Sequence, residues 1–388
     1  MVKFLHTADW QLGQTLKMLG PDRAAELRDA RLRSVRNLLA LGREEDVDFI
    51  LSAGDNFESN QVSNQLVRSI IEILNEFSTA PIYIIPGNHD PLMEDYPFTR
   101  GISYQLGDHV HILTEEEPVE VPGKDATIYP GICQEKKDSN SPIDWIPPRE
   151  GEEGVRIGLA HGNWQVLPEL PNDYPIDEDA TENLGLDYLA LGHWHSTFSA
   201  PEEDKSRTFY SGTPEPTSFD EGDSGNALVV EIDSPRGKPE VTKEHVAEYR
   251  WMKKEAMLSD ETSVDSLEDE LLNLKGDPEK TLLSLRVEGA TSLDVGSRYR
   301  DLIAELEDQF YFLREDRSKL SFVPTDEETR QLVAGKGWLK AAVDKLKKQV
   351  SGDETYVPEE WSFDEPPTRE EAERALALIY TKLNEEEG

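Results

Sequence analysis

Five polar motifs in the first half of the chain share one setting, because each follows directly on a short apolar run. The motifs are Asp9-Trp10-Gln11, Gly54-Asp55-Asn56, Gly87-Asn88-His89-Asp90, His161-Gly162-Asn163 and Gly192-His193-Trp194-His195. Carboxylate, amide and imidazole donors without a thiolate suit Mn²⁺, Fe²⁺ or Zn²⁺, and we expect Mn²⁺ first. Roughly seven donors are too many for one catalytic ion with an open position, so the motifs predict two ions about 3.5–4 Å apart. Asp55 is the expected bridge between them.

The elements that position these motifs are predicted from hydrophobic patterning. Steps of three and four between apolar residues predict helices over Arg23–Ala40 and Gln61–Phe77. Strand–helix–strand order favours parallel pairing in an α/β domain. We therefore expect the five motifs together at one sheet edge, where the carboxyl ends of parallel strands meet and ligands bind. The apolar runs that predict the buried strands are Val2–Thr7, Val47–Ala53, Ala80–Pro86, Val155–Ala160 and Leu186–Leu191.

The 388 residues are long enough for two to three domains. The first, residues 1–235, should close with a strand over Asn226–Asp233, just before the turn residues Ser234-Pro235-Arg236-Gly237. Residues 244–322 alternate strand and helix patterns, which predicts a small α/β domain of about 80 residues. Residues 325–388 contain two capping boxes followed by amphipathic stripes, which predicts a helical tail.

Composition limits the classes of protein to which this chain can belong. The 79 acidic and 40 basic residues give a net charge of −39, which argues against binding nucleic acid or anionic membrane through a general positive field. No apolar run approaches 18 residues and the first residues turn polar early, so we expect a cytoplasmic protein without a membrane partner. The single cysteine, Cys133, excludes an internal disulfide and a cysteine-based zinc site. We expect Cys133 to be buried, and His6, within the first predicted strand, to be packed and hydrogen-bonded.

The series of motifs resembles the calcineurin-like metallophosphoesterase superfamily. Two further stretches are similar to its SbcD-type branch of DNA double-strand-break repair exonucleases: His6-Thr7-Ala8-Asp9-Trp10-Gln11-Leu12-Gly13, and Tyr210-Ser211-Gly212-Thr213-Pro214-Glu215 with Phe219-Asp220-Glu221. The resemblance covers residues 1–233. It implies an α/β fold in which a metallophosphoesterase β-sandwich, flanked by helices, is followed by a small α/β cap domain and C-terminal helices.

Carried over to this sequence, the resemblance implies a role for each ligand-type residue. Asp9, Asp55 and His195 would hold the first metal ion. His89 would be the catalytic histidine beside the leaving group, with Asp90 orienting it, while a hydroxide activated by two ions attacks phosphorus in line. The second ion would be held by Asp55, Asn88, His161 and His193.

The first motif departs from the pattern of the family, which usually has Asp-x-His where this chain has Gln11. An amide oxygen is a weaker donor than an imidazole nitrogen. We therefore expect the first metal ion to bind more loosely, or Gln11 to reach it through water.

Contacts with DNA and with a partner protein are predicted less directly. Lys17, Arg23 and Arg100 lie near the predicted rim and would either contact DNA phosphates or remain solvated surface charge. The resemblance implies that the C-terminal helices dock on the coiled-coil root of an SMC-like ABC ATPase; the alternative is that they fold back on the chain itself. Homodimerisation through the Arg23–Ala40 and Gln61–Phe77 helices is also implied. The apolar candidates for ATPase contact are Leu339, Val343, Leu346, Leu376, Ile379 and Leu383.

The leading hypothesis is a metal-dependent DNA nuclease that acts on ends or single strands as a subunit of a DNA repair complex. A small-molecule phosphodiesterase or phosphatase of the same fold is the first alternative, and the 150 or so residues after the catalytic domain count against it. A non-catalytic scaffold is the second alternative. The one observation that supports a scaffold is Gln11. The presence of His89 and six other ligand-type residues argues against it.

Overall fold

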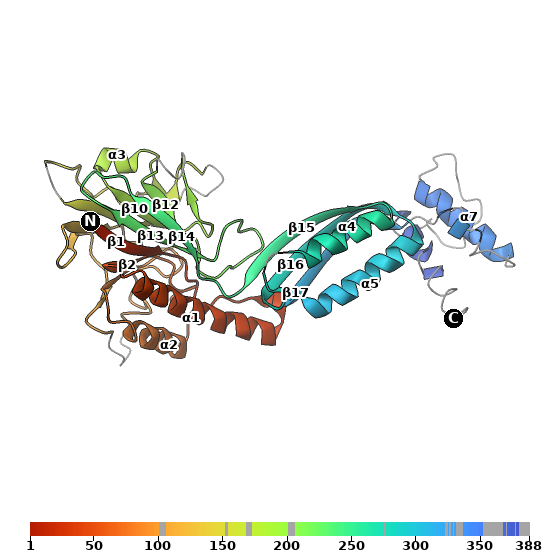
Figure 1. Ribbon diagram of the computed structural model, residues 1–388, viewed down its shortest axis with the longest axis horizontal. Helices are drawn as coiled ribbons and strands as arrows, with labels where there is room; N and C mark the ends of the chain where they lie inside the picture. Colours follow the sequence, from red (N-terminus) through yellow and green to blue (C-terminus); the bar gives the residue numbers. More distant parts are fainter. Residues whose placement is uncertain are drawn as a thin grey trace. The chain divides into compact units, whose positions relative to one another are not determined.

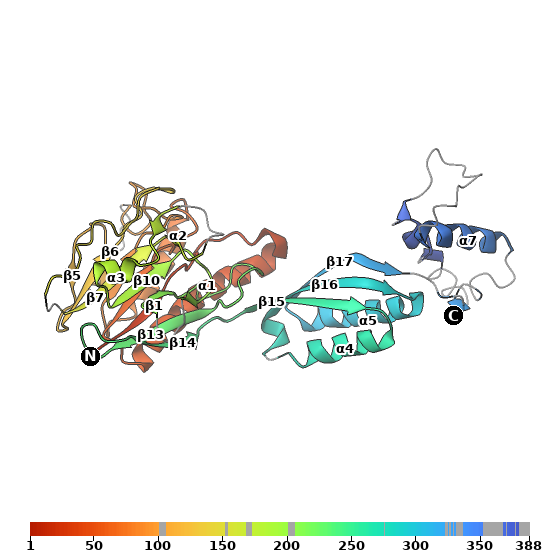
Figure 2. The same cartoon turned by 90° about the horizontal axis from the view of Figure 1, so that it is seen from above.

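The computed structural model describes residues 1–100, 106–151, 154–167, 173–200, 206–274, 276–322, 325, 327–328, 330, 337–351, 368–369, 371–376 and 378–379. The chain forms two compact units, Met1–Arg250 and Trp251–Gly388, which are drawn from two sides in Figures 1 and 2.

Two six-stranded sheets build the first unit. One contains β1 (Val2–Thr7), β2 (Phe49–Ala53), β3 (Ile82–Ile85), β4 (Val110–Ile112), β13 (Asn226–Ile232) and β14 (Glu240–His245), in the order β14-β13-β1-β2-β3-β4. The other contains β5 (Val119–Glu120), β6 (Ala126–Pro130), β7 (Val155–His161), β10 (Tyr188–Gly192), β11 (Phe198–Ser199) and β12 (Thr208–Tyr210), in the order β11-β12-β10-β7-β6-β5. Strands β1 to β4 are parallel to one another, as are β6, β7, β10 and β12.

The side chains of the two sheets alternate between two cores. Phe4 and Phe49 point between the sheets, where they stack on each other at 5.0 Å and meet Tyr188 of the second sheet. Leu5 and Ile50, one residue further along, point to the outer face and pack against α1 (Pro21–Glu44) and α2 (Asn64–Asn75). Because successive strand residues face opposite sides, both faces of these strands are buried. The predicted β-sandwich flanked by helices is confirmed.

Short elements complete the first unit. A 3₁₀ turn, η1 (Lys17–Leu19), precedes α1, which has Pro21 at its first position. The Ser63 hydroxyl accepts a bond of 3.2 Å from the Leu66 amide and so caps the start of α2. The remaining elements are the strand pair β8 (Asn163–Trp164) and β9 (Pro175–Ile176), and α3 (Ala180–Leu184).

The five motif-bearing strands do not belong to one open sheet. Strands β1, β2 and β3 lie in the first sheet, whereas β7 and β10 lie in the second. The expectation of a single sheet edge was therefore wrong in this respect. Fully buried strands have the same continuous apolar pattern in either sheet, so their distribution between two sheets is not visible in the sequence.

The second unit is built on a three-stranded sheet in the order β15-β16-β17. The elements follow the predicted order: β15 (Arg250–Leu258), α4 (Glu261–Leu272), η2 (Pro278–Lys280), β16 (Thr281–Thr291), α5 (Leu293–Gln309) and β17 (Phe312–Phe322). Helices α4 and α5 cover one face of the sheet (Figure 2). Their apolar residues, among them Leu267 and Leu306, form one core with Leu283 and Leu285 of β16.

The first sheet extends further along the chain than residue 235, where we expected the first domain to end. Strand β14 pairs antiparallel with β13 from Glu231–Glu240 to Asn226–His245. The Glu215 carboxylate then accepts bonds of 2.8 and 2.9 Å from the amides of Glu248 and Tyr249. The residues up to Arg250 are consequently part of the first unit. The expected start of the second domain at residue 244 lies within β14 and so within the first unit, while the boundaries at 322 and 325 stay predictions.

The apolar stripes of the tail pack against each other. Helix α7 (Gly337–Ser351) contributes Leu339, Val343, Leu346 and Val350, and the later segment contributes Ala372, Leu376 and the half-buried Ile379. The predicted contact residues therefore cover one another, except for Leu383, which lies outside the described residues. Among the helices that are described, none has the length and hydrophobicity that crossing a membrane requires.

Candidate metal centre

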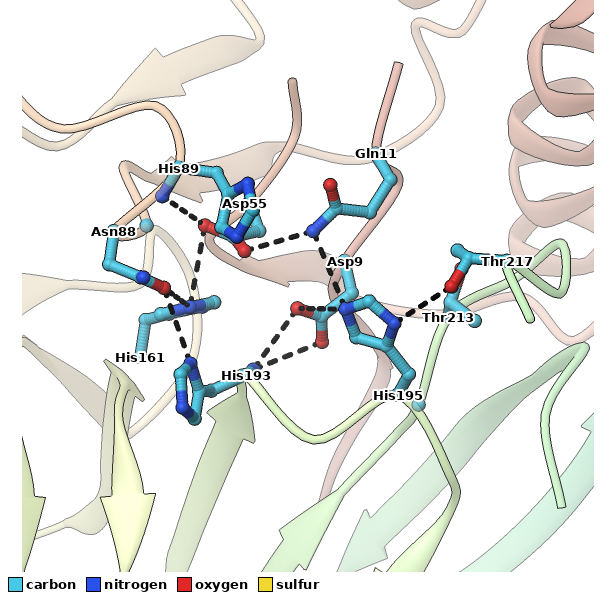
Figure 3. A network of polar contacts seen from close by, with 12 residues as sticks. Asp9, Gln11, Asp55, Asn88, His89, His161, His193, His195, Thr213 and Thr217 are labelled. Carbon is cyan, nitrogen blue, oxygen red and sulfur yellow. Dashed lines mark hydrogen bonds and ion pairs between the residues drawn. The ribbon is translucent and has the colours of Figure 1, made fainter. Parts of the chain in front are cut away.

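The site lies where loops from the two sheets converge (Figure 3). The Asp9 amide donates to the Gly54 carbonyl at 2.9 Å, and the Gln11 amide donates to the Asp55 carbonyl at 3.0 Å. Asp9, Gln11 and Asp55 have φ angles of 52°, 48° and 50°, in the left-handed region that residues with a side chain rarely adopt. Such strain persists only where surrounding interactions fix the backbone, and the bonds between these two loops do so.

Two glycines allow the other loops to approach this point. A Cβ atom on Gly87 would lie 2.2 Å from the Asp55 amide nitrogen, and one on Gly192 would lie 2.1 Å from the Ala53 carbonyl oxygen. Both distances are far below van der Waals contact. The motifs after β3 and β10 therefore need glycine because their backbones press against the loop after β2.

Asp9, Asp55 and His161 form a buried cluster whose ligand atoms all lie within 4.8 Å of one another. Over the described parts of the chain, the two carboxylates form ion pairs with His161 and His195 and with no lysine or arginine. Burial raises the pKa of Asp9 to about 6. Burial also opposes ionisation of Asp55, but His161 and His89 outweigh it and lower the pKa of that carboxyl. Two adjacent buried carboxylates that, among the described residues, have only histidines as charged partners fit a divalent cation.

His161 has the bonding pattern of a metal ligand. Its Nδ1 lies 2.8 Å from the Ala53 carbonyl oxygen, a contact that is favourable when Nδ1 carries the ring proton. In the neutral ring Nε2 then presents a lone pair, yet it lies 2.9 Å from Asn88 Oδ1 and 3.4 Å from Asp55 Oδ1. In that neutral state three electron-rich atoms converge without a proton among them. A cation bound by all three turns this repulsion into coordination.

His193 stands beside this group. Its Nδ1 lies 3.2 Å from Asn88 Oδ1, and its backbone amide donates to both carboxylate oxygens of Asp9 at 3.1 Å. Burial, reinforced by the adjacent His161, lowers the pKa of His193 to about 3, which keeps the ring neutral and its lone pair available. The structure thus brings together Asp55, Asn88, His161 and His193, the four residues that we predicted for the second ion.

His195 lies on the other side of Asp9, with its Nε2 3.9 Å from Asp9 Oδ1. Its Nδ1 faces Glu221 Oε1 at 2.9 Å and Thr217 Oγ1 at 3.0 Å. Burial alone would lower the pKa of His195, but the bond to Glu221 and the charge of Asp9 raise it to about 9. We assigned no role to Thr217 or Glu221 from the sequence; Glu221 was only part of a motif that resembles the SbcD-type branch.

Gln11 is buried in the site, between Asp55 and His195. Its side-chain nitrogen donates to Asp55 Oδ2 at 2.9 Å and lies 3.5 Å from His195 Nε2. In this orientation the amide holds the Asp55 carboxylate and offers no lone pair toward the cluster (Figure 3). The group predicted for the first ion therefore contains two carboxylates and one imidazole, with Gln11 bonded to Asp55.

The loop after β3 places Asp90 differently from what we expected. His89 is exposed, its amide donates to Asp55 Oδ1 at 2.8 Å, and its ring Nδ1 lies 3.2 Å from the Glu58 carbonyl oxygen. The buried Asp90 carboxylate instead accepts from the amides of Gly87 and Phe57 at 2.8 and 3.2 Å. These bonds fix the backbone of the loop, so Asp90 orients the loop and not the imidazole ring.

The three basic candidates have different surroundings. Lys17 and Arg23 are exposed, in η1 and in the first turn of α1. The guanidinium of Arg100 donates to the carbonyl oxygen of Asn60 and, at 2.5 Å, to that of Val62. Arg100 therefore ties down the loop before α2, which argues against the predicted phosphate contact.

Comparisons with known proteins agree with this geometry. The chain is 27% identical over 277 residues to a subunit of the nuclease SbcCD from Bacillus subtilis (strain 168), an alignment that covers 61% of this chain and 67% of that protein. It is 29% identical over 228 residues to the DNA double-strand break repair protein Mre11 from Saccharolobus solfataricus, covering 55% of each. The chain thus spans about two thirds of the first relative and about half of the second. Residues 2–197, just over half of the chain, match the family Calcineurin-like phosphoesterase, and the chain therefore belongs to that family.

Proposed function

We propose that this chain is a metal-dependent nuclease that hydrolyses phosphodiester bonds in DNA. The observation that carries the proposal is the buried cluster of Asp9, Asp55 and His161, whose ligand atoms converge without a described lysine or arginine paired to them. Membership of the phosphoesterase family supplies the reaction class. DNA is supported as the substrate by two relatives, one named a nuclease subunit and the other a double-strand break repair protein.

Two divalent ions, with Mn²⁺ as the preferred choice, fit the two groups of donors. Asp9, Asp55 and His195 would hold the first ion, and Asn88, His161 and His193 would hold the second together with Asp55. When bound, the ions would polarise the phosphoryl oxygens and lower the pKa of a water molecule. Asp55 would serve both ions, because it lies in one cluster with Asp9 of the first group and His161 of the second.

His89 would act on the leaving group. A proton on Nδ1, directed to the Glu58 carbonyl oxygen, leaves Nε2 as the nitrogen that exchanges a proton with the departing oxygen. The bond from the His89 amide to Asp55 ties the position of this ring to the bridging carboxylate. The ring is therefore both exposed to substrate and anchored to the metal cluster.

Cleavage of end-labelled single- and double-stranded DNA in the presence of Mn²⁺ tests the proposal. We expect His89→Ala to lose about 10²–10⁴-fold in rate, the range for removal of a general acid or base. His109→Ala is the matched control, because His109 lies outside the site and bonds to the Leu74 carbonyl. Cleavage that survives His89→Ala would refute the mechanism. Hydrolysis of cyclic nucleotides without cleavage of DNA would favour a small-molecule enzyme, and no hydrolysis at all a scaffold.

A partner protein is the second part of the proposal. We propose that the chain works in the cytoplasm as the nuclease subunit of a complex with an SMC-like ABC ATPase, which residues 325–388 contact. Support comes from a relative named as one subunit of a larger nuclease. Deletion of residues 368–388 should abolish co-purification with such an ATPase and leave hydrolysis of a small chromogenic phosphodiester intact. Loss of both would instead identify a segment needed for folding. A homodimer through α1 and α2 stays a prediction.

A further inference from the structure

The side of His195 that faces away from the metal cluster is closed by a second pair of side chains. Glu221 Oε1 and Thr217 Oγ1 lie 2.9 and 3.0 Å from His195 Nδ1. The Thr217 amide donates to the other oxygen of Glu221 at 2.8 Å, and its hydroxyl also bonds to that carboxylate. Only 7% of the Glu221 side chain is exposed. Thr217 thus bonds to both oxygens of Glu221 and holds the carboxylate in position beside His195.

This arrangement decides which nitrogen of His195 can bind an ion. A carboxylate 2.9 Å from Nδ1 accepts the proton of that nitrogen, so in the neutral ring the lone pair lies on Nε2. Nε2 is the atom that approaches Asp9, at 3.9 Å, and the Gln11 amide nitrogen, at 3.5 Å. A carboxylate that accepts a hydrogen bond from the nitrogen that does not bind the ion also makes an imidazole a more basic ligand.

Gln11 gives this effect its importance in the present chain. The side-chain nitrogen of Gln11 donates to Asp55. Because this chain has glutamine at that position and not histidine, His195 is the one imidazole in the group predicted for the first ion. We propose that Glu221 is a positioning residue that strengthens His195 as a ligand of this ion. The inference rests on the proposed function, because it concerns the metal site of that reaction.

Binding of Mn²⁺ to the metal-free, full-length protein tests the inference without any substrate. Free Mn²⁺ is measured by electron paramagnetic resonance during a titration, and wild-type protein should show one tight and one weaker class of site. Glu221→Gln keeps the shape of the side chain but removes its charge, and should weaken the weaker class about 10–100-fold, as loss of a ligand's hydrogen-bonding partner does. The tighter class should not change.

Asp223→Asn is the matched control, because it removes one carboxylate from the same loop. Asp223 bonds to Lys243 and Asn226 and not to His195, so both classes of site should keep their affinity. Glu221→Asp, which restores the charge, should recover part of the loss. Gln11→His combined with Glu221→Gln should recover more of it, because a second imidazole then serves the first ion.

The position of the ring proton provides a readout that a merely structural role would not change. Long-range ¹H–¹⁵N spectra of metal-free protein, recorded at a pH at which the His195 ring is neutral, should show this ring protonated on Nδ1 in wild type, and a mixture of tautomers in Glu221→Ala. Should a Glu221 variant fail to fold, Thr217→Val removes a second partner of Nδ1 and should produce the same change in smaller measure.

Two results would overturn the inference. One is Mn²⁺ binding by Glu221→Gln that equals that of wild type in both classes. The other is an equal weakening of both classes together with a lower melting temperature, which would identify a purely structural residue. Failure of wild-type protein to bind Mn²⁺ would instead refute the proposed function, so the two failures are distinguishable.

Discussion

Replacing Arg31 by methionine should loosen the segment that carries Thr217. Arg31 is 1% exposed and donates to the carbonyl oxygens of Glu215 and Pro216 at 3.0 and 2.7 Å, and to Gln14 Oε1 at 2.8 Å. Methionine has similar length but no donor. Each bond from a charged donor contributes about 1.5–3 kcal/mol, while removal of a buried charge returns part of that sum. We expect the free energy of unfolding to fall by about 3 kcal/mol.

Urea unfolding, followed through the fluorescence of the seven tryptophans, measures this loss. The midpoint should decrease without a change in slope, because the surface exposed on unfolding is the same. Arg36→Met on the same helix is the control, since Arg36 is half exposed and its closest acid is Glu76 at 3.7 Å; it should change stability by less than about 0.5 kcal/mol. A loss below about 1 kcal/mol for Arg31→Met would show that other contacts hold the segment, and the reasoning would fail.

Three further changes probe the sheets, a buried acid and the first ion. His6→Leu removes the bonds of 3.0 and 3.2 Å from the ring to the Tyr188 hydroxyl and the Leu191 carbonyl; unfolding free energy should fall by about 1–3 kcal/mol, and Tyr188→Phe in the same protein should restore part of it. Burial raises the pKa of Glu215 to about 7, so native protein keeps a proton that the unfolded chain releases near pH 4.5. The free energy of unfolding should therefore decrease by up to about 3 kcal/mol as the pH rises from about 4.5 to 7. In denaturant titrations Glu215→Gln should show a smaller decrease over the same pH range. Gln11→His should tighten the weaker Mn²⁺ site about tenfold. Metal analysis after dialysis should find less than two ions per wild-type chain, and two equally tight ions would contradict our interpretation of Gln11.

The ligand-type residues were predictable because they stand at the ends of strongly apolar strands. Asp9 and Asp55 each stand one residue after a buried run, and the glycine before Asp55 marks the point where the chain leaves the sheet. The assignment of β7 and β10 to a second sheet was not predictable, since a strand buried on both faces has the same pattern in either sheet. Sequence patterning therefore predicted which side chains lie at strand ends, and not which sheet brings each of them to the site.

The partners of polar side chains were the least predictable feature. Asp90 bonds to the amides of Gly87 and Phe57, and Arg100 to two carbonyl oxygens of another loop. Backbone donors and acceptors are the same for almost every residue type, so no spacing in the sequence indicates them. Asp90 next to His89 suggested a bond to the ring, whereas the fold directs the carboxylate to the backbone.

The net charge of −39 limits how the proposed nuclease can bind DNA. Two divalent ions would add four positive charges at one point of an otherwise repulsive surface, so phosphate binding should be local and depend on the metal. Each phosphate neutralised by a basic side chain contributes about −0.9 to the slope of log K against log salt, and a basic groove with 6–10 contacts gives a steep dependence.

We expect His89→Ala protein to bind a labelled duplex weakly without Mn²⁺, and with Mn²⁺ to show a slope shallower than about −2 between about 50 and 200 mM salt in fluorescence anisotropy. Tight binding without metal and with a steep slope would require a basic surface on this chain. The absence of such binding would mean that most of the affinity for DNA comes from a partner, because four local charges cannot offset a field of this sign along a length of duplex.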